Sequence, residues 1–291
     1  MMRNFSFNLL NLWKINLNGM KRKSIFLLFA VALAFLPGCN RNSTKVDLYN
    51  DECGVTRRIN IDEKNVYLVF TAHYSEIDSG YFENFDGVVP VLDILKEKGV
   101  KGSFFPTGCC FRQEKYKDAI QRIIDEGHYL SAHSNNHLEL CSTDEQHRTL
   151  VSADSLAKDI AGMEAELAKF GLKKEQYRWM IPPYESYNKE NADDLRNLGY
   201  LLCNPTYGIE TSLDWAGPDS GQYCSAEELV SNIWLYDKID TEHGLNGCII
   251  LIHAMNYPDR TDDDRVYTHL GEIIDGLRDR GYGFKTFKDL L

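Results

Sequence analysis

The sequence contains no internal repeat, no low-complexity tract and no flexible linker that would separate two domains. Solenoids and other repeat architectures are therefore excluded. The 291 residues allow one large domain or two small ones, and the missing linker favours one.

The chain also lacks an apolar run long enough for a comfortable membrane span, which takes about 20 residues. Its main apolar run, Ile25 to Phe35, follows the basic segment Met20 to Lys23 and precedes Leu36-Pro37-Gly38-Cys39. A basic segment, a short apolar core and a box that ends in cysteine are typical of a bacterial lipoprotein signal. We therefore expect removal of residues 1–38, a lipid on Cys39, and a tether and N-terminal extension over residues 39–64.

Basic side chains are scarce, because 43 acidic side chains stand against 32 basic ones. The first 38 residues hold five of the basic side chains and none of the acidic ones, so the mature chain has a formal charge of −16. This charge argues against nucleic acid as a partner and suits a domain that acts on a neutral or cationic substrate. Held by its lipid, the protein would lie in the bacterial cell envelope, on the periplasmic side or the outer-membrane face. Its oligomeric state is left open.

No cysteine spacing resembles a cysteine metal site. Seven cysteines remain besides Cys39, and an exported protein can pair some of them in disulfides. An odd number leaves at least one thiol unpaired. Cys203 and Cys248 lie in apolar, strand-like runs and are predicted to be buried thiols.

Apolar runs rich in β-branched residues alternate with helical patterns along the mature chain. This alternation predicts an α/β fold with a parallel sheet and helices outside it. The active site of such a fold forms from the loops at the carboxyl ends of the strands. The predicted strands are residues 66–71, 102–106, 129–133, 178–182, 200–204, 248–253 and 283–287, and the predicted helices are residues 86–98, 116–124, 156–170 and 226–236.

Two histidines, His133 and His137, lie four residues apart where the predicted strand 129–133 ends. An i, i+4 pair puts both imidazoles on one face of a turn, and neutral imidazole is a favoured ligand of zinc and similar ions. Ordinary turn histidines are the alternative, since eight histidines in one chain sometimes fall four apart. The pair alone leaves both interpretations open.

Three motifs occur in a fixed order: His133-Ser134-Asn135-Asn136-His137, then Ile181-Pro182-Pro183-Tyr184, then Ile249-Ile250-Leu251-Ile252-His253. This set resembles the polysaccharide deacetylase family, carbohydrate esterases of the NodB-homology type. The resemblance covers residues 65–291 and implies an incomplete (β/α)7 barrel. It implies a deacetylase that removes acetyl groups from an acetylated polysaccharide or oligosaccharide. His133 and His137 would hold a divalent metal, most often zinc, and His253 would be the general acid.

Two positions depart from the family pattern. The family's first motif reads Thr-Phe-Asp-Asp-Gly, with one aspartate as the general base and the next as a metal ligand, whereas this chain has Thr71 and Ala72 there. The arginine that orients the base is replaced by Ile181. Losing the arginine together with the carboxylate is physically coherent, because either charge alone would be left without its partner.

The missing aspartates leave the third metal ligand and the general base to be assigned. His73 could replace the lost ligand, or it could be only a polar residue at a strand end. Glu185, Asp78 and Glu76 are the candidates for the base. Glu185 could instead bind a sugar or accept a hydrogen bond from a nearby backbone amide. The predicted site thus has His133, His137 and His73 at the metal, and His253, Glu185 and Asp78 in catalysis.

The alternative function is a carbohydrate-binding lipoprotein on the same barrel that has lost catalysis with its two aspartates. A carboxylate close enough to the metal site for one water molecule to bridge them would favour the enzyme over the binding protein. Asp214-Trp215 resembles the family's fourth motif only loosely, and residues 206–222 are predicted to form a long loop over the site. Four aromatic side chains could stack on sugar rings or merely pack at the barrel rim: Trp179, Tyr184, Tyr187 and Trp215.

Overall fold

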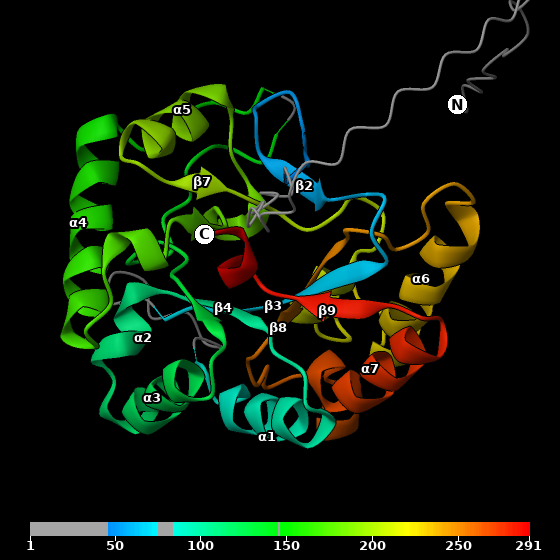
Figure 1. The fold of residues 1–291 in the computed structure, drawn as a ribbon. Coiled ribbons are helices and arrows are strands. Elements are labelled where there is room, and N and C mark those ends of the chain that lie inside the picture. The colour runs from blue at the N-terminus through cyan, green and yellow to red at the C-terminus, as the bar shows by residue number, and fades with distance from the viewer. Residues whose placement is uncertain (1–45, 75–83, 145) are drawn as a thin grey trace, which may run out of the picture. The chain divides into compact units, whose positions relative to one another are not determined.

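One long central strand organises the fold. The structure is a computed structural model that describes residues 46–74, 84–144 and 146–291 (Figure 1). The central strand, β3 (Asn65–Ala72), buries seven of its eight residues, as expected of a strand that is covered on both faces. β8 (Ile249–His253) pairs in parallel along one edge of β3. β9 (Gly283–Lys285) and β4 (Ser103–Pro106) share the other edge, and β5 (Tyr129–Leu130) extends the sheet beyond β4.

A second parallel pair, β6 (Trp179–Met180) and β7 (Leu201–Leu202), continues the barrel. Side chains join β5 to this pair: Trp179 N donates to the Tyr129 hydroxyl at 2.9 Å, and the Ser131 hydroxyl donates to Tyr177 O at 2.9 Å. All seven predicted strands therefore form, as β3 to β9, and the prediction of strands is confirmed. β5, β6 and β7 are shorter than predicted, at two residues each.

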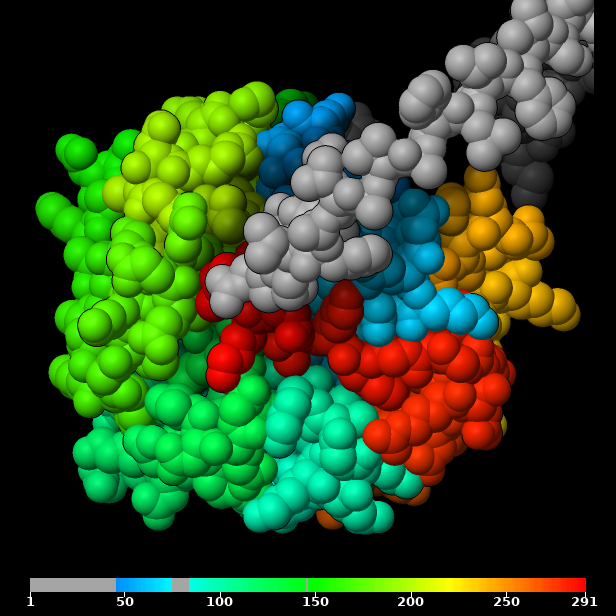
Figure 2. Space-filling model, viewed as in Figure 1, coloured from blue at the N-terminus to red at the C-terminus, as the bar shows by residue number. Residues whose placement is uncertain are grey.

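An antiparallel hairpin that was not predicted precedes the barrel. It consists of β1 (Leu48–Asn50) and β2 (Thr56–Ile59). β2 forms a parallel bridge from Thr56 to Cys203 and an antiparallel bridge from Arg58 to Cys248. It therefore lies between the segments of β7 and β8 and joins them. Figure 2 shows this hairpin segment, in blue, at the surface beside the yellow-green segment that includes α5.

The helices lie outside the strands (Figure 1). The four predicted helices form as α1, α3, α4 and α6, and three further helices form as α2, α5 and α7. Ser152 and Ser225 cap the first turns of α4 and α6, as serine commonly does. The bounds are α1 (Val88–Lys98), α2 (Gly108–Arg112), α3 (Lys117–Asp125), α4 (Ala153–Lys169), α5 (Lys189–Asn197), α6 (Ala226–Ile239) and α7 (Leu270–Asp279).

The barrel interior is filled by aromatic and branched side chains around Phe287. The ring of Phe287 lies 5.1 Å from that of Trp179 and 5.7 Å from those of Tyr67 and Phe105. Trp179 is only 2 % exposed. The suggestion that Trp179 stacks on a sugar is therefore wrong, because its strand position turns the indole into the core.

The described part of the chain shows neither a disulfide nor a helix that could span a membrane. Within the described ranges the cysteines form no disulfide with one another, and Cys203 and Cys248 are fully buried, as predicted. Among the same residues, no helix combines the length and the apolar character that a membrane crossing needs.

Candidate active site

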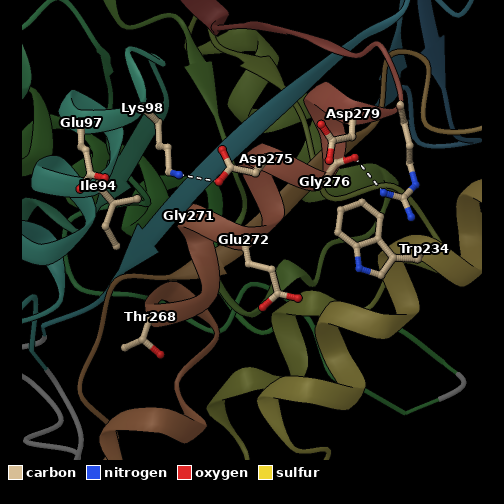
Figure 3. A pocket seen from close by; sticks show the side chains of 11 residues that line it. Ile94, Glu97, Lys98, Trp234, Thr268, Gly271, Glu272, Asp275, Gly276 and Asp279 are labelled. Carbon is tan, nitrogen blue, oxygen red and sulfur yellow. Dashed lines mark hydrogen bonds and ion pairs between the residues drawn. The ribbon is translucent and has the colours of Figure 1, made fainter.

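One groove in the helix layer holds none of the predicted site residues. It has a volume of about 750 Å³ and lies between α1, α6 and α7 (Figure 3). Its cationic side chains are engaged with neighbours: Lys98 donates to Asp275 at 2.5 Å, and Arg280 packs 4.2 Å from the ring centre of Trp234. The predicted chemistry lies instead at the carboxyl ends of the strands.

Four predicted histidines meet at that end of the barrel. His73 follows β3, His133 and His137 lie on the loop after β5, and His253 is the last residue of β8. The ring centres of His73 and His137 are 4.3 Å apart, and those of His133 and His137 are 4.9 Å apart. His253 lies 6.4 Å from His73, edge to face. The fold thus gathers side chains that are up to 180 positions apart in the sequence.

Three of these imidazoles are neutral. Burial lowers the pKa of His73 and of His133 to about 3, and it lowers the pKa of His137 well below its usual value. The Nδ1 atom of His133 lies 2.8 Å from the carbonyl oxygen of Ile181. A carbonyl can only accept, so Nδ1 carries the proton and Nε2 keeps its lone pair.

The imidazoles of His73, His133 and His137 are chemically suited to bind a divalent metal. Among the described residues, no three His, Cys, Asp or Glu side chains already have the arrangement of a complete metal-binding group. The neutral imidazoles nevertheless present the form that binds zinc, and the Ile181 carbonyl fixes the tautomer of His133 as metal-site partners do. His133, His137 and His73 are the residues that could hold the ion.

The loop that carries His133 and His137 is clamped by a buried aspartate of α4. Asp159 accepts hydrogen bonds from the backbone N–H groups of Asn135 at 2.7 Å and Asn136 at 3.1 Å. Asn135 also fits closely against glycines, because a Cβ at Gly108 would lie 2.4 Å from its Oδ1 and one at Gly162 would lie 3.0 Å from its Nδ2. The sequence signal that could have revealed this clamp is an aspartate on the apolar face of the predicted helix 156–170.

Replacing Asp159 by alanine should destabilise the protein by about 2–4 kcal/mol, because one buried and one partly buried N–H group would lose their acceptor. Urea denaturation of the purified protein measures this change. Asp154→Ala is the matched control, since Asp154 is an exposed aspartate in the first turn of the same helix. Equal stability of the two variants would mean that Asp159 does not hold the loop.

His253 is held by a carboxylate that the sequence analysis did not assign. Asp214, in the short helical turn Thr211–Trp215, accepts from His253 Nδ1 at 2.5 Å and from its backbone N–H at 3.1 Å. Burial alone would lower the pKa of His253, but the carboxylates of Asp214 and Glu185 outweigh it and raise the pKa. The bond at Nδ1 leaves Nε2 as the atom that can exchange a proton.

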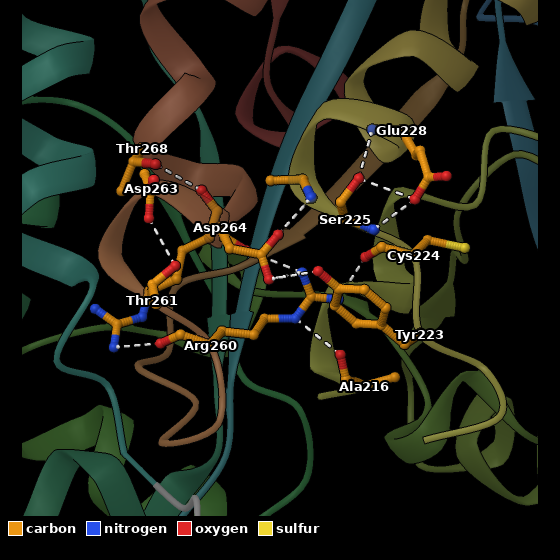
Figure 4. Close-up of polar contacts among 12 residues, drawn as sticks. Ala216, Tyr223, Cys224, Ser225, Glu228, Arg260, Thr261, Asp263, Asp264 and Thr268 are labelled. Atoms are coloured by element: carbon orange, nitrogen blue, oxygen red, sulfur yellow. Dashed lines mark hydrogen bonds and ion pairs between the residues drawn. The ribbon is translucent and has the colours of Figure 1, made fainter. Parts of the chain in front are cut away.

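A buried arginine anchors the loop that carries Asp214 (Figure 4). Arg260 is 2 % exposed and donates to Ala216 O at 2.9 Å and to Cys224 O at 2.7 Å. Its charge is balanced by Asp264, which also accepts from Ala226 N at 2.8 Å. Arg260 follows β8, so it ties the loop after β7 to the segment that leaves His253. The predicted long loop over residues 206–222 is thus fixed in place beside the site.

Glu185 brings a carboxylate to the same place. Its Oε2 accepts a hydrogen bond from the Ser212 hydroxyl at 3.1 Å. Ser212 lies in the same helical turn, Thr211–Trp215, as Asp214. Burial raises the pKa of Glu185, against the opposing effects of His253 and the Ser212 bond. The charges of Glu185 and His253 favour each other, because His253 lowers the pKa of Glu185 and Glu185 raises the pKa of His253.

The backbone around these side chains is strained. Tyr184 and Glu185 have φ angles of 56° and 55°, and Ser134 and His137 have φ angles of 64° and 54°. Left-handed backbone is unfavourable for residues other than glycine and is often found at functional sites. Four of the seven such residues in the described ranges lie in the two site loops, which supports a functional role for these loops.

The remaining candidates divide by exposure. The ring of Tyr184 lies 4.3 Å from that of His137 and is 55 % exposed, so a ligand can reach it. Trp215, next to Asp214, is 39 % exposed. The Tyr187 hydroxyl is engaged with Arg57 and Asp51. Asp78 and Glu76 lie outside the described residues, so their predicted roles stay predictions.

The barrel and the histidine cluster at the carboxyl ends of its strands define an α/β-barrel protein of the carbohydrate esterase type. Residues 59–203 match the family model described as polysaccharide deacetylase. The chain is 27 % identical over 233 residues to the peptidoglycan-N-acetylmuramic acid deacetylase PdaA of Bacillus subtilis, which covers 80 % of this chain and 73 % of that protein.

Solved structures agree with this assignment. A family 4 carbohydrate esterase from Bacillus anthracis is 26 % identical, with a TM-score of 0.53 over 79 % of this chain and 84 % of that one. A family 4 pseudoenzyme from Bacillus anthracis has the same fold, with 18 % identity and a TM-score of 0.58 over 81 % and 68 % of the two chains. The chain is a divergent member of the polysaccharide deacetylase family, and the predicted (β/α)7 fold is confirmed.

Proposed function

We propose that the protein is a metal-dependent hydrolase that removes acetyl groups from an acetylated polysaccharide or oligosaccharide. One observation carries the proposal: buried neutral imidazoles meet a carboxylate-held His253 and the carboxylate of Glu185 at one end of the barrel. The similarity to a peptidoglycan deacetylase supports an acetylated amino-sugar polymer as the substrate.

His133, His137 and His73 would hold the divalent ion, and zinc suits a set of imidazole donors. When bound, the ion polarises the acetyl carbonyl and lowers the pKa of a water molecule. The protein's own contribution is to keep all three imidazoles neutral by burial and to fix the tautomer of His133.

Glu185 and His253 would divide the proton transfers. Glu185 takes a proton from the attacking water, and its raised pKa makes it a stronger base than an exposed carboxylate. His253 then gives a proton from Nε2 to the departing nitrogen or oxygen of the sugar. Asp214 holds the ring through Nδ1 and favours the protonated form that this step needs.

The competing function is a binding protein that has lost catalysis. It is favoured by Thr71 and Ala72, which stand where the family has its two aspartates. Glu185 counts against it, because this side chain supplies a carboxylate beside the predicted general acid.

Metal analysis and acetate release from the purified mature chain test the proposal. We expect about one divalent ion per chain and acetate release from an N-acetylated or O-acetylated glycan. A protein with bound metal that releases no acetate from a panel of both kinds of substrate would support the binding protein instead.

We also propose that a lipid on Cys39 anchors the protein in the bacterial cell envelope. Cys39 lies outside the described residues, and the support is the order of basic segment, apolar core and cysteine box. Cys39→Ser should move the protein from the membrane to the soluble fraction, as judged by fractionation and immunoblotting. A variant that still sediments wholly with membranes would show that another segment is the anchor.

A further inference from the structure

A groove of about 710 Å³ opens beside Tyr184 and Glu185, on the side of the N-terminal hairpin. It is continuous with the candidate active site, because Tyr184 and Glu185 line the groove and the ring of Tyr184 lies 4.3 Å from that of His137. Its wall is built by the loops that follow three of the strands and by the hairpin segment. Arg57, Tyr187 and Tyr207 lie in this wall as well.

Arg57 of β2 is the centre of this wall, but it is not available to bind an anion. Its Nε lies 3.2 Å from Asp51 Oδ2, its Nη1 donates to Pro205 O at 2.9 Å, and its Nη2 donates to the Tyr187 and Tyr207 hydroxyls. The charge is balanced by Asp51, and only 13 % of the side chain is exposed. Arg57 therefore acts as a support.

The support holds an exposed aromatic ring. The guanidinium carbon of Arg57 lies 3.8 Å from the ring centre of Tyr207, and Nη2 bonds the Tyr207 hydroxyl at 2.7 Å. Tyr207 is nevertheless 63 % exposed. One face of the ring thus rests on a fixed cation, which lowers the conformational entropy that the ring loses when a ligand packs on it.

The charge of the groove favours an uncharged or cationic occupant. Glu52 and Glu185 line it, while both of its cationic side chains are already paired, Arg57 with Asp51 and Lys189 with Asp193. The apolar face of a sugar ring packs on an aromatic ring, and its hydroxyl groups can bond to the polar side chains of the wall. An anionic ligand would meet these two glutamates, and each cation of the wall already has an aspartate as its partner.

We infer that this groove is a subsite for a sugar unit of the same glycan chain, distant from the unit that loses its acetyl group, and that Tyr207 is its stacking platform. This inference rests on the proposed function. Such a subsite makes the protein selective for glycan chains over single sugars, because only a longer glycan reaches from the histidine cluster past Tyr184 to Tyr207.

The test uses the mature chain and N-acetylglucosamine oligomers of two to six units. Tyr207→Ala should raise KM for the six-unit oligomer about five- to tenfold, with kcat unchanged, and leave KM for the two-unit oligomer as it was. Tyr207→Phe should keep most of the affinity, because it retains the ring. Tyr49→Ala, which removes an exposed tyrosine of β1 outside the groove, is the control.

The outcomes separate the two proposals. If the unmodified protein releases acetate and Tyr207→Ala has an unchanged KM at every length, the subsite is wrong and the proposed function stands. If the unmodified protein releases no acetate, calorimetry with the six-unit oligomer decides the subsite. Weaker binding by Tyr207→Ala alone supports it, and equal binding by all variants, or no binding by any, overturns it.

Discussion

Glu185→Gln is expected to lower kcat about a hundredfold or more while the bound metal is retained. The amide keeps the shape of the side chain and its bond from Ser212, but it cannot take a proton from water. A residue that only binds sugar would instead change KM. Acetate release under saturating substrate, with metal analysis of the same samples, distinguishes these cases.

Two kinds of comparison make this experiment decisive. Glu190→Gln removes an exposed carboxylate five residues further along and should leave kcat unchanged. Glu76→Gln and Asp78→Asn address the other predicted bases. If Glu185→Gln keeps near-full kcat and one of these two loses it, the base belongs to the segment that follows β3.

The double variant His133→Ala/His137→Ala should lose both its metal and its activity, the largest effect that we expect for any change. Two of the three proposed ligands disappear, and one remaining imidazole cannot hold a divalent ion at micromolar concentration or below. Metal content by mass spectrometry is the direct readout, and acetate release is the second.

His243→Ala/His269→Ala is the matched control, since it removes two partly exposed histidines that lie outside the cluster. It should bind metal as the unmodified protein does. Stoichiometric metal in the His133/His137 variant would place the site elsewhere. Loss of metal in both double variants would point to a general loss of folding, which circular dichroism would show.

The barrel strands could be predicted from the sequence because buried strands are rich in apolar residues. β3 and β8 are apolar along their length, since parallel strands are covered on both faces. β2 was missed for the opposite reason: its sequence Thr-Arg-Arg-Ile is polar at its centre, and it becomes a strand only where β7 and β8 leave a gap. Tertiary context of this kind overrides local preference.

Two of the helices, α4 and α5, show the same division between strong and weak patterns. α4 has a long apolar face and a serine cap, and the sequence predicted it. α5 buries only Asn191, Ala192 and Leu195, so its pattern is weak. α7 was missed although it does carry an apolar face, with Leu270, Ile273, Ile274 and Leu277 at helical spacing.

The histidines of the candidate site could be predicted, because they lie in or beside recognisable motifs. The side chain that hydrogen-bonds to His253 could not, because it comes from a distant loop. His133, His137, His73 and His253 follow from the sequence, and the fold brings them together. Asp214 comes from a loop 39 residues before His253, and the loose match of Asp214-Trp215 to the family's fourth motif did not assign it as the partner of that ring. For Trp179 the sequence left sugar stacking and packing open, because composition cannot tell which side of a short strand faces the barrel interior.

β2 lies between β7 and β8 and is held there by contacts with segments far along the chain. The contacts of Arg57 and Arg58 with Tyr187, Pro205 and Asn246 span 130, 148 and 188 residues of chain. The pairing of β3 with β8 spans similar distances along the chain, but β1 is exposed along its length and β2 is buried only at its two ends, whereas β3 and β8 are almost wholly buried. The hairpin is therefore expected to open first, so hydrogen exchange should be faster there than in β3 or β8. The hairpin that supports Tyr207 in the proposed glycan subsite would then open locally more easily than the central strands of the barrel.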